Sequence, residues 1–246
     1  MRVPLERAEE ARAELLKFAA HGFEERDLPG ELELAVYGGP EIEEALRASF
    51  GEVSCERVEP GWEDNWRAFH HPVEIGRLWV GPPWEEARES LLPVVIDPGR
   101  AFGTGSHPTT RLCLELLQEL EPASLLDVGC GSGVLAIAAA RLGFAPITAF
   151  DNDPAAIEAT LSNAEVNGVS FDVRLTDVLA DSLPQTEVAV CNISLPVLET
   201  LAPRLESERL VASGFLASDE LRLDGYRVVS RREQAEWAAV LADRKH

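Results

Sequence analysis

At residues 125–133 the chain reads Leu125-Leu126-Asp127-Val128-Gly129-Cys130-Gly131-Ser132-Gly133, an apolar run that passes directly into alternating glycines. The apolar residues predict a buried strand, and the alanine-rich stretch from Gly133 to Leu142 predicts a helix. Glycines let the backbone turn tightly and approach a ligand where any Cβ would clash. The first turn of the helix adds free N–H groups and the positive end of the helix dipole. The sequence therefore predicts a ligand-binding loop between a strand and a helix.

Strand and helix patterns alternate on both sides of this loop, from about residue 91 to the end. We expect helices at 108–120, 133–142, 154–167 and 196–205, and strands at 125–128, 147–150, 171–175, 188–191 and 210–213. The last two segments, 226–230 and 237–241, are expected to form an antiparallel hairpin at the edge of the sheet. This α/β alternation is typical of a doubly wound, mostly parallel sheet with helices on both faces, the Rossmann-like architecture.

The first 60 residues follow another pattern. The expected order is a short strand, a charged helix at 6–20, two strands around Pro29-Gly30, a helix at 41–49 and a last strand at 52–58. The order β-α-β-β-α-β over so short a span is that of a small ferredoxin-like α+β domain. Residues 61–90 hold four of the five tryptophans and are interpreted as an aromatic-rich connector. The expected division of the chain is therefore 1–60, 61–90 and 91–246.

Charge is the unusual feature of the composition. Lys and Arg total 22 against 43 Asp and Glu, which gives a net charge of −21. A chain this acidic repels a phosphate backbone, so direct binding of nucleic acid is not expected. The acidity has two interpretations, which are solubility and the attraction of a basic partner.

The cysteines and histidines exclude other classes of site. The four cysteines are scattered without a C-x-x-C pair, and neither they nor the five histidines have zinc-ligand spacing. We therefore expect no metal site and no disulfide framework. The start of the chain lacks an apolar signal core, and no apolar stretch approaches the roughly 20 residues that span a bilayer. We expect a cytoplasmic protein that does not contact a membrane.

The spacing within the glycine loop discriminates between cofactors. A dinucleotide fingerprint G-x-G-x-x-G/A needs a small residue at position 134, where this chain has Val134. Here the third glycine comes one residue earlier, and Asp127 stands two residues before Gly129. This D-x-G-x-G-x-G form resembles the first motif of class I S-adenosylmethionine (SAM) methyltransferases. The resemblance implies SAM as the cofactor, and a nicotinamide oxidoreductase is the less favoured alternative.

Acidic residues stand at the ends of three consecutive predicted strands. Asp151 ends the strand after the loop, where a carboxylate can accept hydrogen bonds from both ribose hydroxyls. Asp127 could reach the amino end of the methionine moiety, directly or through water, and Asp177 could accept from the adenine amino group. Each residue alone could be a helix cap or a turn residue, an interpretation that suits Asp177 well. Together, the three positions favour a cofactor site.

A longer segment resembles one methyltransferase family closely. Residues 97–113 read Asp97-Pro98-Gly99-Arg100-Ala101-Phe102-Gly103-Thr104-Gly105-Ser106-His107-Pro108-Thr109-Thr110-Arg111-Leu112-Cys113, which is similar to the signature segment of the PrmA family. The resemblance continues through the glycine loop, Asp151-Asn152-Asp153-Pro154 and Asn192-Ile193. PrmA enzymes methylate the stalk-base protein of the large ribosomal subunit (protein eleven). The resemblance implies a SAM-dependent protein-lysine methyltransferase, a basic ribosomal protein as its partner, and a small N-terminal domain that recruits this substrate.

The resemblance also implies roles for individual residues. The positions that match cofactor-binding segments of the family are Thr110, Gly129, Gly131, Asp151, Asn152 and Asn192. Phe102, Gly103, Thr104 and Gly105 match a loop that closes over the cofactor, and the glycines there suit a mobile loop. Asn192 also matches the catalytic position, where its amide oxygen would accept a hydrogen bond from the target amine and aim the lone pair at the methyl group. His107 is tempting as a general base, but a loop-structuring role is favoured.

The chain departs from the family pattern in two places. After Asn192 it reads Ser194-Leu195-Pro196-Val197 where the family has a small residue and Gly-Pro-Leu, so the amine pocket is expected to differ in shape. Residues 215–225 leave little room for the helix that family members carry before the final hairpin, and apolar surface exposed there suggests a partner or a homodimer. The alternatives that stay open are another protein lysine as the target, a small-molecule amine as the target, and a noncatalytic SAM-binding module.

Overall fold

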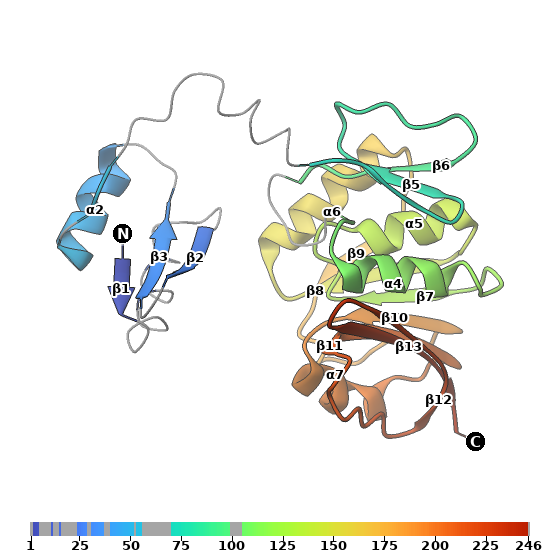
Figure 1. Ribbon diagram of the computed structural model, residues 1–246. Coiled ribbons are helices and arrows are strands. Elements are labelled where there is room, and N and C mark those ends of the chain that lie inside the picture. Colours follow the sequence, from blue (N-terminus) through green and yellow to red (C-terminus); the bar gives the residue numbers. More distant parts are fainter. Residues whose placement is uncertain are drawn as a thin grey trace. The chain divides into compact units, whose positions relative to one another are not determined.

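The computed structural model describes part of the 246-residue chain (Figure 1). The described residues are 2–4, 11, 15, 24–28, 31–36, 40–51, 53–55, 70–98 and 105–245. The chain divides into two compact units, residues 1–64 and 65–246. No helix in the described ranges has the length and the apolar composition needed to cross a bilayer.

Within the described residues of the first unit, short strands form an antiparallel sheet in the order β1-β3-β2. The bounds are Arg2–Pro4 for β1, Glu24–Leu28 for β2, Glu31–Ala35 for β3 and Pro40–Phe50 for helix α2. Leu32 and Leu34 of β3 are buried with Leu46 of α2, because alternate residues of a strand face the same side.

Two of the elements expected in this unit fall partly or mostly outside the described residues. Residues 53–55, the described part of the strand expected at 52–58, are not in a strand. The helix expected at 6–20 lies mostly outside the described residues. The ferredoxin-like description of the first unit therefore stays a prediction.

Residues 105–245, which are described without a gap, contain a seven-stranded sheet in the order β12-β13-β11-β10-β7-β8-β9. The strands are β7 Leu125–Val128, β8 Ile147–Asp151, β9 Asp172–Leu175, β10 Val188–Asn192, β11 Arg209–Leu216, β12 Tyr226–Gln234 and β13 Trp237–Arg244. Strands β7 to β11 run parallel, whereas β13 pairs antiparallel with both β11 and β12. The predicted mostly parallel sheet with a final hairpin is confirmed.

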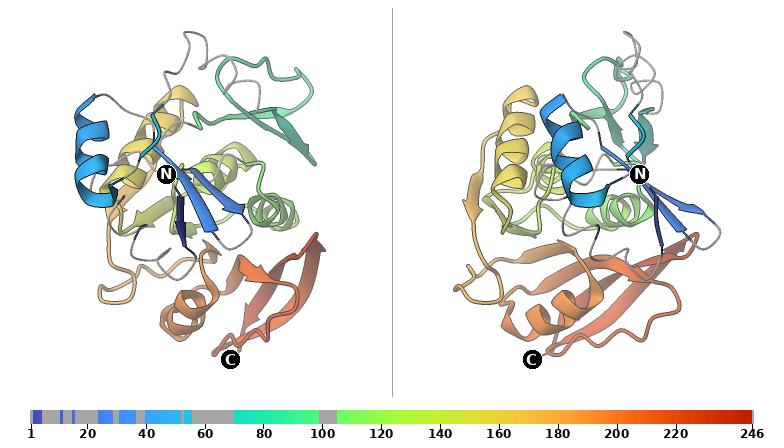
Figure 2. Two further views of the ribbon diagram at one scale, coloured as in Figure 1. Left: turned by 60° about the vertical axis from the view of Figure 1, so that its left-hand side comes forward. Right: turned by 90° about the vertical axis from the view of Figure 1, so that its left-hand side faces the viewer.

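Helices cover both faces of this sheet (Figures 1 and 2). They are α4 Pro108–Leu117, α5 Val134–Leu142, α6 Pro154–Val166 and α7 Leu195–Leu201, with a 3₁₀ turn at Ala202–Arg204. Leu125 packs in a core with α4, α5 and α6, while the next residue, Leu126, packs in a second core with α7. Neighbouring side chains of a strand point to opposite faces, so a continuous apolar strand needs a cover on each side.

A smaller sheet precedes α4 and packs on the same core. Its strands are β4 Val73–Ile75, β5 Leu78–Gly81 and β6 Leu92–Val95. Strands β4 and β5 form a hairpin, and β6 joins β5 in parallel. Leu78, Val80 and Val94 are buried among residues of α4 and α5. Part of the expected connector thus belongs to the core of the second unit, and the three-part division of the chain stays a prediction.

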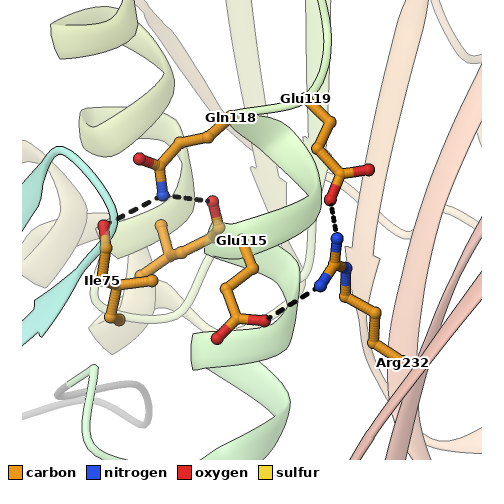
Figure 3. Close-up of polar contacts among 6 residues, drawn as sticks. Ile75, Glu115, Gln118, Glu119 and Arg232 are labelled. Atoms are coloured by element: carbon orange, nitrogen blue, oxygen red, sulfur yellow. Dashed lines mark hydrogen bonds and ion pairs between the residues drawn. The ribbon is translucent and has the colours of Figure 1, made fainter.

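Polar contacts hold helix α4 from two sides (Figure 3). On one side, Gln118 bridges to the turn between β4 and β5. Its Nε2 donates to Ile75 O at 3.0 Å, and its Oε1 accepts from Arg77 N at 2.7 Å. On the other side, Arg232 of β12 forms ion pairs with Glu115 of α4 and with Glu119, which follows the end of the helix. Helix α4 therefore ties the small sheet to the edge of the large one.

Gln118→Ala is expected to lower the free energy of unfolding by about 1–3 kcal/mol, because two backbone groups of the β4–β5 turn lose their partner. Arg232→Ala removes only exposed ion pairs, which contribute about 0–1 kcal/mol. It is the control on the opposite side of α4. Urea unfolding of both variants measures the difference, and equal losses would contradict this contribution of Gln118.

The segment between β11 and β12, residues 217–225, is described and contains no helix. Leu223 and Tyr226 pack into the core on the α7 side of the sheet. Further along the edge strand, Val228 and Val229 are 44% and 46% exposed. Apolar side chains are thus exposed at the sheet edge, and a homodimer at this edge stays a prediction.

Candidate active site

The glycine loop joins β7 to α5 and turns through left-handed backbone. Gly129, Gly131 and Gly133 have φ of 75°, 54° and 81°, a range that residues with a Cβ rarely adopt. A Cβ on Gly129 would lie 2.6 Å from Cγ2 of Ile193, so a side chain has no room there. The N–H of Gly129 donates to Phe150 O at 2.8 Å, which binds the loop to β8.

Asp151, the last residue of β8, is half-buried beside the loop. Its Oδ2 accepts from Gly131 N at 2.9 Å, and its Oδ1 accepts from Asp153 N at 3.0 Å. Asp153 in turn caps α6 by accepting from Ala155 N. Each carboxylate oxygen has two lone pairs, so both retain capacity for a ribose hydroxyl. The structure brings this carboxylate and the glycine loop together, and the ribose contact stays a prediction.

Asp127 is fully buried under the first turn of α5. Its Oδ2 accepts from Ala136 N at 3.0 Å, whereas its Oδ1 has no hydrogen-bond partner within the described residues. Burial raises the pKa of Asp127 to about 7, and the negative charge of Asp151 adds to this effect. An orphaned buried oxygen fits a cofactor that brings an ammonium group, or an ordered water, to this end of the loop. The residues present therefore fit SAM, which carries an ammonium group on its methionine part.

Asp127 is expected to make stability depend on pH. Its pKa is raised in the folded protein, so the unfolded chain loses this proton first, and the free energy of unfolding falls as pH rises from about 4 to about 7. Asp127→Asn removes the ionisation, so the variant gains stability relative to wild type across this window. Chemical denaturation at several pH values measures the gain. A difference that stays constant across the window would contradict the raised pKa.

The end of β10 meets the first turn of α4. Asn192, the last residue of β10, donates from Nδ2 to Oγ1 of Thr110 at 3.3 Å. Thr110 is fully buried, and Asn192 is half-buried. Because Nδ2 faces Thr110, the amide Oδ1 remains an acceptor on the other side of the side chain. Thr110 and Asn192 are both predicted site residues. They are 82 positions apart in the chain, and the fold brings them into contact.

His107 caps helix α4. Its Nδ1 accepts from Thr109 N at 3.3 Å and lies 2.8 Å from Thr109 Oγ1. Its ring meets the ring of Trp237 edge-on, with the centroids 5.0 Å apart. A ring that caps a helix and packs on an aromatic neighbour suits the structural role that the sequence favoured over a general base.

The hydrogen bonds of the glycine loop and of Asn192 described above do not involve the other predicted site residues, which are Asp177, Asn152 and residues 102–105. Asp177 sits in a turn after β9, where its Oδ1 accepts from Leu179 N at 3.0 Å and its N–H donates to Asp181 at 3.1 Å. This is the turn role that the sequence allowed, and the adenine contact stays a prediction. Asn152 is exposed after the end of β8. Of the loop expected to close over the cofactor, residues 102–104 lie outside the described residues, and Gly105 is described with φ of 87°.

The sequence patterns did not single out Gly214 of β11 or Thr160 and Asn163 of α6, although all three contact parts of the site. Gly214 has a φ of 101°, and a Cβ there would lie 2.0 Å from Ile193 O. Glycine in a strand signals a bulge or a close backbone approach. Thr160 and Asn163 are polar residues on the buried face of α6. A polar residue on the face of a helix that its apolar periodicity turns to the core is the sequence signal that could have found them.

The described residues contain no group of three or more His, Cys, Asp or Glu side chains placed to hold a metal ion. All four cysteines are free; Cys55 is exposed, and Cys113, Cys130 and Cys191 are buried. Burial raises the pKa of the three buried thiols, to about 12 for Cys130. These thiols are therefore neutral at pH 7 and are neither nucleophiles nor thiolate ligands.

The candidate site gathers at one edge of the large sheet. The glycine loop follows β7, while Asp151 and Asn192 end the strands on either side of it, β8 and β10. Ligands of open α/β sheets bind outside the carboxyl ends of the strands. This fold and this site define a class I SAM-dependent methyltransferase, an enzyme with SAM as its cofactor.

A family model described as ribosomal protein L11 methyltransferase (PrmA) matches residues 41–245. The chain belongs to this family. It is 42% identical over 221 residues to a ribosomal protein L11 methyltransferase of Symbiobacterium thermophilum, covering 82% of this chain and 73% of the relative. It is 44% identical over 198 residues to the one of Photobacterium profundum, covering 70% of this chain and 65% of the relative.

A solved structure agrees with this assignment. The crystal structure of a ribosomal protein L11 methylase from Lactobacillus delbrueckii subsp. bulgaricus matches with a TM-score of 0.63 at 28% identity, covering 72% of this chain and 100% of that chain. The matched part of the chain spans 73% and 65% of the length of the two relatives above.

Proposed function

We propose that the chain transfers methyl groups from SAM to lysine or other amino groups of ribosomal protein L11. The observation that carries the proposal is the contact between Asn192 and Thr110, which leaves the amide oxygen of Asn192 as an acceptor for an amine at the edge of the cofactor site. The names of the family and of the relatives support L11 as the substrate.

The cofactor is held, in this proposal, by the loop between β7 and α5 and by the acidic residues beside it. Gly129 and Gly131 let the backbone approach SAM closely. Asp151 accepts from the ribose hydroxyls with the lone pairs that its two backbone contacts leave over. Oδ1 of Asp127 accepts from the amino end of SAM or from an intervening water. Asn152, exposed beside Asp151, completes the ribose end.

Asn192 and Thr110 orient the amine in this proposal. The sulfonium of SAM makes its methyl group electrophilic, so the protein needs to align the nucleophile and exclude water. Asn192 Oδ1 accepts a hydrogen bond from the amine and so directs the nitrogen lone pair away from the amide. Thr110 keeps the amide from rotating because it accepts from Nδ2. A lysine must be neutral to react, and burial in a dry pocket lowers its pKa.

Transfer of labelled methyl groups from SAM to purified L11, followed by peptide mass spectrometry, tests the proposed substrate. Wild-type protein is expected to label lysine or terminal amino groups of L11. In a second reaction, a mixture of ribosomal proteins lets other proteins compete with L11 for the label. Labelling of another protein in that mixture, and none of L11, would overturn the substrate and leave the methyltransferase class in place.

The net charge of −21 is expected to speed the encounter with a basic ribosomal protein. For the protein substrate, kcat/KM is expected to fall about tenfold between about 0.01 M and 0.15 M salt, as the screening length shrinks from about 30 Å to about 8 Å. The Kd for SAM, a small ligand, is the control and is expected to change less. A kcat/KM that does not respond to salt would rule out electrostatic steering.

A further inference from the structure

Helix α6 buries polar side chains on the face that it turns toward the glycine loop and β6. Thr160 and Asn163 of the helix, and Asn167 at its C-cap, are 0%, 3% and 4% exposed. Their spacing places them on one side of the helix. A buried polar group is destabilising unless it is hydrogen-bonded, so the partners of these side chains show what this face holds in place.

Two of these side chains hold carbonyl groups of the glycine loop. Thr160 Oγ1 donates to Gly131 O at 3.0 Å, and Asn163 Nδ2 donates to Ser132 O at 2.8 Å. In a planar trans peptide, the N–H of the next residue points opposite to the carbonyl. The two contacts therefore fix the peptide planes that follow Gly131 and Ser132, and the N–H of Gly133 adds a contact within the loop by donating to Cys130 O at 2.8 Å.

The same face of α6 also holds the free edge of β6. Asn167 accepts from Val95 N at 2.8 Å and donates to Val95 O at 2.6 Å. Asn163 Oδ1 accepts from Asp97 N at 3.1 Å, just after β6. Asn163 thus bonds the loop with one end of its amide and the backbone after β6 with the other. Asn167 bonds β6 and its own helix.

We propose that Thr160 and Asn163 are positioning residues that set the affinity for SAM by fixing the peptide planes of the glycine loop. The inference rests on the proposed cofactor role of residues 129–133 and concerns side chains that act through Gly131 and Ser132. Loss of either donor leaves a carbonyl of the loop without its partner, and the loop rotates to regain one. That rotation changes the backbone conformation that the loop presents to the cofactor.

Asn163→Asp and Asn167→Asp form a matched pair of test variants. Each keeps an oxygen that accepts from the backbone N–H at Asp97 or Val95, and each replaces the amide donor with a second oxygen. Only Asn163→Asp loses a bond to the loop. Calorimetry is expected to give a Kd for SAM about tenfold higher than wild type for Asn163→Asp, and within about twofold of wild type for Asn167→Asp. Both variants are expected to lower the thermal midpoint.

Kinetics adds a measurement that general destabilisation would not produce. For Asn163→Asp, the KM for SAM is expected to rise about tenfold while kcat at saturating SAM stays within about twofold. Thr160→Val loses the hydroxyl at nearly constant shape and is expected to raise the Kd for SAM about fivefold. If Asn163→Asp does not fold, the Kd for SAM of Thr160→Val tests the proposal instead.

The inference is overturned by a normal Kd for SAM in Asn163→Asp or, if that variant does not fold, in Thr160→Val. It is equally overturned by an equal rise of the Kd in Asn167→Asp. Wild-type protein that does not bind SAM at all would contradict the proposed function itself, which is a different result. Binding by wild type is therefore measured first.

Discussion

Asn192→Ala is expected to lower kcat for methyl transfer about a hundredfold, whereas the Kd for SAM is expected to change by less than about fivefold. Alanine removes the acceptor that orients the amine, and a misplaced nucleophile reacts slowly even when the methyl donor is bound. Single-turnover kinetics at saturating SAM measures the chemical step, and calorimetry measures binding. A normal kcat in this variant would remove Asn192 from the reaction.

The contact with Thr110 provides a graded control for this result. Thr110→Val removes the acceptor of Asn192 Nδ2 but keeps the amide, so an intermediate loss of kcat, about tenfold, is expected. Asp224→Ala, in the segment between β11 and β12, removes an exposed side chain outside the candidate site. It is expected to leave kcat within about twofold of wild type.

Gly214→Ala is expected to lower the free energy of unfolding by at least about 2 kcal/mol. Gly214 lies at a bulge of β11 with φ of 101°, and a Cβ there would lie 2.0 Å from Ile193 O and 2.6 Å from Ile193 C. These are backbone atoms, so they cannot move aside as the end of a side chain could. The turn after β10 must shift, and Asn192 shifts with it, so turnover is expected to fall as well.

Gly225→Ala separates backbone strain from close contact. Gly225 has φ of 85°, but nothing lies within 4 Å of the Cβ position. Alanine there has only the strain of left-handed backbone, about 1–2 kcal/mol. Thermal unfolding is expected to give a lower midpoint for Gly214→Ala than for Gly225→Ala, with a shift of about 2–4 °C for each kcal/mol. Turnover is compared at a temperature below the thermal midpoints of both variants, and only Gly214→Ala is expected to have lower turnover there. Similar midpoints and similar turnover in the two variants would contradict an effect of the close contact at Gly214.

Periodicity and glycine spacing predicted the second unit well, because its strands are continuous apolar runs and its helices have clear starts and ends. The strand expected at 125–128 coincides with β7. The helix expected at 196–205 is shorter: α7 ends at Leu201 and a 3₁₀ turn follows, because Pro203 has no N–H to continue the α-helical pattern. The strands β12 and β13 extend beyond the expected hairpin, since their backbone pairing continues past the apolar residues.

The small sheet of β4, β5 and β6 was not predicted. Its strands are three or four residues long, so each shows too few alternations to stand out from a connector. Prolines and tryptophans between them gave the segment the composition of a linker. The pairing of β5 with β6 is a contact between segments that are separated in the chain, and no local pattern reports it.

For the candidate site, the strand ends were predictable and the contacts across the sheet were not. The positions of Asp151 and Asn192 follow from where strands stop, which periodicity shows. The burial of Asp127 under α5 and its raised pKa depend on packing that the sequence does not display. The roles of Asn163 and Gly214 depend on which distant backbone approaches them, so only the fold reveals them.

The distribution of thiols makes this protein suitable for selective labelling. Reagents such as maleimides react with the thiolate, so a buried thiol with a raised pKa is protected twice, by access and by protonation. The exposed Cys55 lies in the first unit, while the other three cysteines lie in the second. A fluorophore on Cys55 would therefore report on the first unit during catalysis and leave the methyltransferase unit chemically intact.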